Sequence, residues 1–146
     1  MLTVAVHFAA PAGSIGRAVF LAAAMQVYRG ERLRAASITY VVVDDPSIRR
    51  INRRFLGHDF PTDVITFPLD ETPREAEIYI SVDTARRQAR QFRVSLREEI
   101  MRLAIHGFLH VCGYDDADEP QRARMVEAQE RHLRLALQKR RKAKLT

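Results

Sequence analysis

Two histidines stand four residues apart at the end of a predicted helix, and two aspartates follow them closely. His106 and His110 would project from one helix face, one turn apart, so that both imidazoles can bind a single ion. Gly113 can adopt the left-handed conformation that ends a helix and turns the chain back toward the histidines. The spacing predicts a metal site whose third ligand is Tyr114, Asp115 or Asp116.

A histidine pair at this spacing is weak evidence alone, because five scattered histidines give one in about one sequence in ten. The alternative interpretation is that the two histidines lie on a polar or packed face of the helix and bind no metal. Gly107 occupies the position where zinc peptidases of the H-E-x-x-H type carry their general-base glutamate, which disfavours peptidase chemistry. Two histidines and a carboxylate also describe the facial triad of non-haem iron oxygenases, but the sequence shows no cosubstrate pocket.

The helix that carries the histidines has clear sequence signals at both ends. Ser95 and Glu98 form a capping-box pattern, and Gly113 is a natural stop. Apolar spacing and turn residues predict further helices over 15–28, from Asp44-Asp45-Pro46 to about Phe55, over 83–92 and over 119–139, followed by a solvated tail at 140–146. About four strands are expected, at 2–8, 37–43, 64–67 and 78–81.

Composition indicates a globular protein with a basic surface. The 146 residues suit one domain over 1–146, with 47% hydrophobic residues and a net charge of +6. Of the 24 basic residues all but three are arginine, which favours a polyanionic partner, although genome base composition can produce the same excess. We expect a cytoplasmic protein, since the sequence contains no secretory signal, no membrane span and a single cysteine. That residue, Cys112, points away from the histidines and is expected in the core.

Two sequence blocks carry a family resemblance. HGFLHVCGYDD at 106–116 resembles the H-G-x-L-H-x-x-G-Y-D-H signature of the YbeY family of ribosomal RNA maturation endoribonucleases. INRRFLGHDFPTDVITF at 51–67 and AEIYIS at 76–81 are similar to further blocks of that family, in the same order. The resemblance implies an α+β fold, with a small mixed sheet flanked by helices and a zincin-like metal helix.

The resemblance also implies a function. It predicts a single-strand-specific metallo-endoribonuclease in 3′-end maturation of small-subunit ribosomal RNA and in ribosome quality control. One zinc ion would be held by His106, His110 and Asp116, with metal-activated water as nucleophile or base. The expected partners are single-stranded RNA, ribosomal RNA and the small ribosomal subunit, without a membrane.

The sequence departs from the family pattern at two positions. Asp116 replaces the third histidine, which makes another divalent metal possible, because a carboxylate lowers the net charge of the site. Leu56 replaces an arginine, and the expected substrate contacts are then Arg53, Arg54 and His58.

Two further expectations concern the chemistry itself. Asp115 is a candidate proton acceptor or supporting group beside the metal ligands, or else an aspartate that stabilises the turn. The alternative function is a non-catalytic, ribosome-associated RNA-binding assembly factor with a structural metal, in which Leu56 and Asp116 mark lost catalysis.

Overall fold

The computed structural model describes residues 1–145, which form a four-stranded sheet and five helices and confirm the predicted α+β class. The strands are β1 (Leu2–Phe8), β2 (Ala36–Val43), β3 (Val64–Glu71) and β4 (Arg74–Ser81). The helices are α1 (Arg17–Gly30), α2 (Asp45–Leu56), α3 (Val82–Phe92), α4 (Leu96–Val111) and α5 (Glu119–Leu145).

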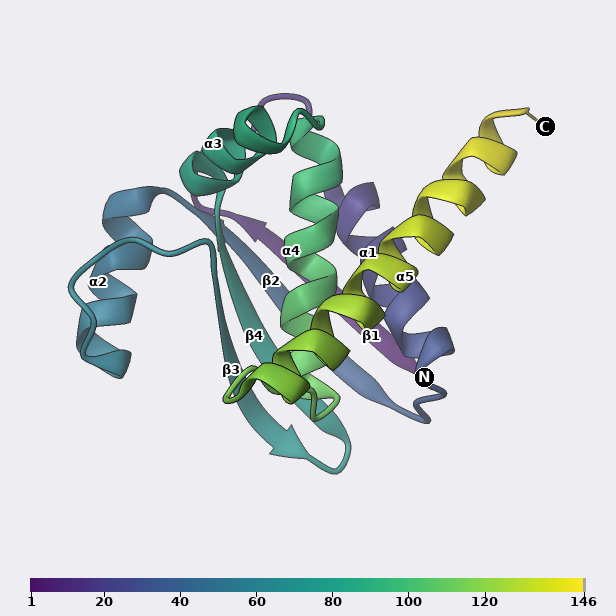
Figure 1. Cartoon of the computed structure of the whole chain (residues 1–146), viewed down its shortest axis with the longest axis horizontal. Coiled ribbons are helices and arrows are strands. Elements are labelled where there is room, and N and C mark those ends of the chain that lie inside the picture. The colour runs from purple at the N-terminus through teal and green to yellow at the C-terminus, as the bar shows by residue number, and fades with distance from the viewer. Residues whose placement is uncertain (146) are drawn as a thin grey trace.

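The sheet is mixed, with strand order β1-β2-β4-β3 (Figure 1). β1 and β4 both run parallel to β2, whereas β3 is antiparallel to β4. β2 is an interior strand, as its β-branched run predicts. Its burial alternates, however, so that Ile38, Tyr40 and Val42 are fully buried while the side chains between them are only half-buried.

The two faces of the sheet are covered unequally, which explains that alternation. α1 and α4 pack on one face, α5 lies over both helices, and the main hydrophobic core fills this side (Figure 1). α2 covers the other face, where Ile48 packs with Val43 and Ile65 in a much smaller cluster. Within residues 1–145, no helix combines the length and apolar character needed to cross a bilayer.

Side-chain caps fix the helix starts that the sequence signals predict. The Asp44 carboxylate accepts a hydrogen bond from the Ser47 amide at 2.9 Å, and the Ser95 hydroxyl accepts one from the Glu98 amide at 3.0 Å. Each bond satisfies an amide that has no partner within its own helix.

Three predicted boundaries were wrong. α5 does not end near Lys139 but continues to Leu145, because its last residues are good helix formers without glycine or proline. The strand predicted at 64–67 continues to Glu71, and the strand predicted at 78–81 begins earlier, at Arg74. Much of the segment predicted to be a loop pairs instead as a β-hairpin.

α4 packs tightly against the sheet at Gly107. A Cβ atom there would lie 2.5 Å from Ile78 Cγ2 and 3.1 Å from Thr66 Oγ1. The Thr66 hydroxyl also donates a hydrogen bond to the Gly107 carbonyl at 3.3 Å. Glycine is therefore required at this position by packing, and no larger residue fits while α4 keeps its place.

We expect Gly107→Ala to lower the free energy of unfolding by about 1–3 kcal/mol, because the added methyl overpacks the helix–sheet contact. Thermal and urea denaturation would measure the loss. Gly16→Ala is the matched control, since no atom lies within 4 Å of a Cβ added there. Equal stability of the two variants would contradict this account of the packing.

Candidate metal centre

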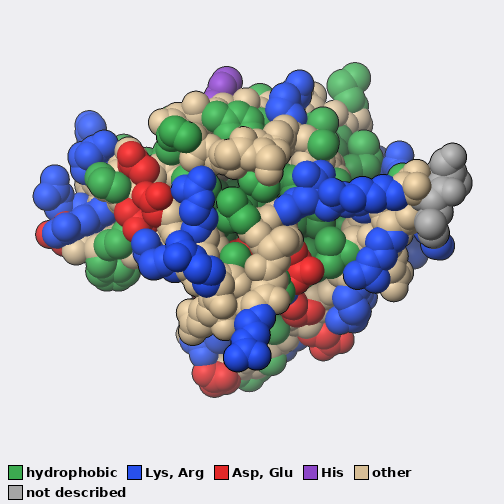
Figure 2. All heavy atoms as spheres, turned by 90° about the horizontal axis from the view of Figure 1, so that it is seen from above, with side chains coloured by type: hydrophobic (Ala, Val, Ile, Leu, Met, Phe, Trp, Pro, Cys, Tyr) green, Lys and Arg blue, Asp and Glu red, His purple; other side chains and the backbone are tan. Residues whose placement is uncertain are grey.

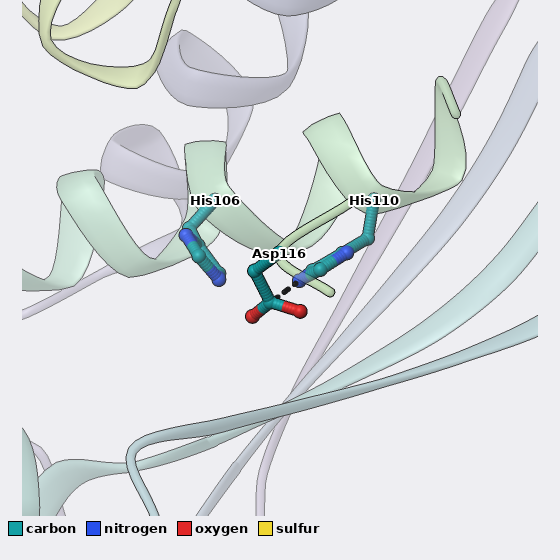
Figure 3. A group of neighbouring side chains, drawn as sticks. All are labelled: His106, His110 and Asp116. Atoms are coloured by element: carbon teal, nitrogen blue, oxygen red, sulfur yellow. Dashed lines mark ion pairs between the residues drawn. The ribbon is translucent and has the colours of Figure 1, made fainter. Parts of the chain in front are cut away.

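The structure brings His106, His110 and Asp116 together on one side of α4 (Figure 3). Their candidate ligand atoms all lie within 4.8 Å of one another, and His110 Nε2 is 4.0 Å from Asp116 Oδ2. Both histidines are half-buried on the helix, whereas Asp116 is exposed on the turn that follows Gly113. Gly113 has a φ of 100°, so the predicted left-handed turn returns the chain to the histidines. The three side chains could hold a metal ion.

Hydrogen bonds fix the orientation of both imidazoles. His110 Nδ1 lies 3.1 Å from the Tyr114 carbonyl oxygen, which can only accept, so Nδ1 carries the hydrogen. His106 Nδ1 lies 2.7 Å from Gln129 Oε1, while the amide nitrogen of Gln129 donates to Glu130 at 3.0 Å. Nδ1 of His106 is therefore also the donor. Each Nε2 then keeps a lone pair, which is the form that binds a metal.

Electrostatics favour the same ligand form. Burial, and secondly the neighbouring His106, lower the pKa of His110, which keeps its imidazole neutral near physiological pH. Cys112 is not a competing ligand, because burial raises the pKa of its thiol to about 12 and its side chain packs against the main core. Cys112 is half-buried and packs against the core without being one of its buried residues, so the prediction of a core residue holds only in part.

Two cavities border this group of side chains. One, of about 500 Å³, is lined by His110 together with Thr66 of β3 and the segment after α2. The other, of about 670 Å³, is lined by His106 and Asp116 together with Phe92 and Val126. A chain-like substrate could therefore extend to both sides of the three side chains.

The first cavity carries an aromatic wall, of which His58 was an expected substrate contact and Phe60 was missed. The rings of His58 and Phe60 are stacked, with centroids 5.4 Å apart and an angle of 10° between planes. Asn52, itself buried, donates a hydrogen bond to the Phe60 carbonyl at 2.9 Å and holds this segment against α2. Phe60 remains 53% exposed, so its ring is available to a ligand. Leu56 lines the same cavity.

The other predicted site residues lie less centrally. Asp115 lines the first cavity, and its Oδ1 accepts a hydrogen bond from the Asp116 amide at 2.7 Å. Arg53 faces a separate cavity on α2, and the Arg54 guanidinium lies 5.3 Å from the Phe55 ring centroid. Neither arginine lines the cavities beside the histidines.

Gln129 and Asp63 were also missed. Gln129 comes from α5, 23 positions after His106, and no local pattern links them. Asp63, within the Pro-Thr-Asp block, accepts hydrogen bonds from the Val64 amide and from Gln88, and so joins the start of β3 to α3. Its position in a family block was the available signal, but that signal gives no structural role.

Comparisons with known proteins agree with this arrangement. A family model described as Endoribonuclease YbeY matches residues 17–136. The Endoribonuclease YbeY of Chlorobium phaeovibrioides is 43% identical over 103 residues, which is 70% of each chain. That of Chloroherpeton thalassium is 41% identical over 108 residues, or 73% of this chain and 77% of the relative. A solution structure of a Thermotoga maritima protein is similar with a TM-score of 0.68 and 25% identity, covering 98% of this chain and 93% of that one.

We expect Gln129→Ala to weaken zinc binding by about 10- to 100-fold, because the His106 ring loses the acceptor that fixes its orientation. A competitive titration against a chromogenic chelator would measure the affinity. Gln138→Ala removes an exposed amide from the same helix and should leave it unchanged. Equal affinities of the two variants would rule out this role of Gln129.

Proposed function

The chain belongs to the YbeY endoribonuclease family, and on that premise we propose a metal-dependent hydrolase that cleaves single-stranded RNA. Its proposed role is 3′-end maturation of small-subunit ribosomal RNA and ribosome quality control in the cytoplasm, with the small subunit as partner. One observation carries the proposal: two oriented imidazoles and a carboxylate stand together, with a cavity on either side of the group.

Zinc is the proposed ion, held by His106, His110 and Asp116. A tetrahedral zinc site accepts two histidines and one carboxylate, and exposed Asp116 can close on the ion by side-chain rotation. A divalent ion held there would polarise the phosphodiester and lower the pKa of water, which then serves as nucleophile or base. The carboxylate also makes manganese or magnesium more competitive than at a three-histidine site.

The first cavity supports selection of single strands. An unpaired base can stack on an exposed aromatic ring, whereas a base in a duplex is already stacked on its neighbours. His58 and Phe60 offer such a surface beside His110, and Leu56 adds an apolar contact where the family has an arginine. Arg53 and Arg54 would contact backbone phosphates further along α2, outside the cavity.

For Asp115 we propose a positioning role and, secondarily, a proton acceptor. Its Oδ1 accepts the Asp116 amide, which holds the turn that presents the third ligand. Its carboxylate is exposed and lines the first cavity, so it has room to accept a proton from the attacking water. The Gly107 position offers no base for this step.

We expect His110→Ala and Asp116→Ala to abolish both metal binding and cleavage of single-stranded RNA, because each removes one of three ligands. Protein purified without a metal-binding tag would be analysed for metal content and for cleavage of single- against double-stranded RNA. His7→Ala, a histidine outside this group, is the control.

The outcomes separate the alternatives. Metal bound without cleavage would favour the non-catalytic assembly factor, for which Leu56 and Asp116 are the supporting departures. Neither metal nor cleavage would contradict both functions for this chain.

We expect Phe60→Ala to weaken binding of single-stranded RNA about fivefold or more, since base–aromatic stacking contributes roughly 1–3 kcal/mol. Fluorescence anisotropy with a labelled oligonucleotide would measure the dissociation constant. Phe55→Ala is the control, because Phe55 is 60% exposed on α2 but does not line the cavity. Equal losses in both variants would place the stacking surface elsewhere.

A further inference from the structure

A further cavity, remote from the histidines, gathers positive charge. It lies between α1, the first turn of α4 and the C-terminal half of α5, with a volume of about 340 Å³. Its lining includes four cations, Arg29, Arg97, Lys139 and Arg140, and no carboxylate among the described residues. Figure 2 shows that Lys and Arg side chains continue over the C-terminal part of α5, on the right of that view. We call this cavity, which the four cations line, the cationic cavity.

Arg97 is held there against its electrostatic preference. It occupies the first turn of α4, where the helix dipole favours anions over cations. Glu98 and Glu99, its nearest acidic neighbours in sequence, pair instead with Arg102, at 3.6 and 2.5 Å. Arg97 Nε is buried and has no hydrogen-bond partner within the described part of the chain. Such a donor normally has an acceptor, so the position calls for one from outside.

The other cations increase the local potential. Burial, and secondly the charge of Arg140, lower the pKa of Arg97, so the two guanidinium groups repel each other. The Lys139 ammonium donates to Gln26 Oε1 at 2.7 Å, and that amide is 4% exposed. Among the described residues no carboxylate lines the cavity, so the cavity itself supplies no anion that would neutralise these charges.

Lys139 is also held in place by a buried network. The Gln26 amide nitrogen lies 3.1 Å from His132 Nδ1, and His132 Nε2 lies 2.8 Å from a Glu31 carboxylate oxygen. Because Gln26 accepts from Lys139, its nitrogen must face His132 as the donor. The network fixes the ammonium at the edge of the cavity before any ligand arrives, which reduces the entropy lost on binding.

We propose that the cationic cavity binds a backbone phosphate of RNA, as a second contact separate from the metal centre. Arg97 precedes His106 by nine positions, which places the two on opposite sides of α4 at 100° per residue. The proposal rests on the proposed function only in taking RNA as the source of the phosphate. Guanidinium forks bind phosphate oxygens in pairs, and three arginines line this cavity.

Arg97→Gln and Arg140→Gln test the site. Each should weaken binding of a single-stranded RNA about fivefold at 0.1 M salt and reduce the slope of log affinity against log salt by about 0.7. Without RNA, each should leave the melting temperature unchanged or raise it, because like-charge repulsion is relieved. A merely structural role of these arginines would lower it.

Arg34→Gln is the matched control, since it removes the same charge from an exposed segment before β2. If it reduces the salt slope as much as the cavity variants do, general charge explains the effect and the proposal fails. Binding is measured with zinc-free protein and in the presence of a chelator. If the wild-type protein does not cleave RNA, the proposed function fails, but RNA binding by the cationic cavity can still be measured.

Inorganic phosphate distinguishes the two sources of the ligand. If phosphate raises the melting temperature of the wild type but not of Arg97→Gln, while the salt slope for RNA is the same in both, the site takes a free phosphate and the RNA assignment is overturned. If neither phosphate nor RNA distinguishes the variants from the wild type, the cavity binds no phosphate.

Discussion

The close packing of α4 on the sheet sets the position of every other part of the site. At Gly107 the helix backbone reaches Ile78 and Thr66 with no room for a methyl group, and the Tyr40 hydroxyl donates to the Ala104 carbonyl at 3.0 Å one turn earlier. Both contacts lie between rigid elements, so α4 can neither slide nor rotate without breaking them. His106 and His110 lie on the same helix, close to Gly107 in sequence, so the packing of α4 also fixes their positions. Packing therefore excludes a glutamate at position 107, in addition to any chemical reason for its absence.

The metal-binding group and its surroundings were predictable to different degrees. The histidine pair, the capped start of α4 and the stop at Gly113 are local signals, and the family signature identified Asp116 as the third member. Gln129, which orients His106, joins the site through the packing of α5, and no spacing in the sequence reports such a contact. The direction of Arg53 and Arg54 was equally beyond prediction, since an amphipathic helix does not reveal which cavity its charged face borders.

Charge and aromatic surface are separated on this molecule. The cavity that contains His110 presents Leu56, His58 and Phe60, whereas groups of cations lie at the far end of α4 and on α2. A site that grips a substrate only through phosphate contacts binds any nucleic acid, because phosphates carry no information about pairing. Under the proposed function, a stacking surface beside the candidate metal site would add a preference for unpaired bases, and the remote charges would add affinity without altering that preference.

The length of α5 has a mechanical consequence. The helix supplies Gln129 to the His106 ring and, ten residues later, Lys139 to the cationic cavity, about 15 Å away along its axis. An α-helix is stiff over that distance, and α5 packs against α1 and α4 through Ala128, Leu133 and Ala136, so the spacing between the two side chains is fixed. A single rigid helix thus sets the distance between the amide that orients His106 and the cation at the proposed phosphate site.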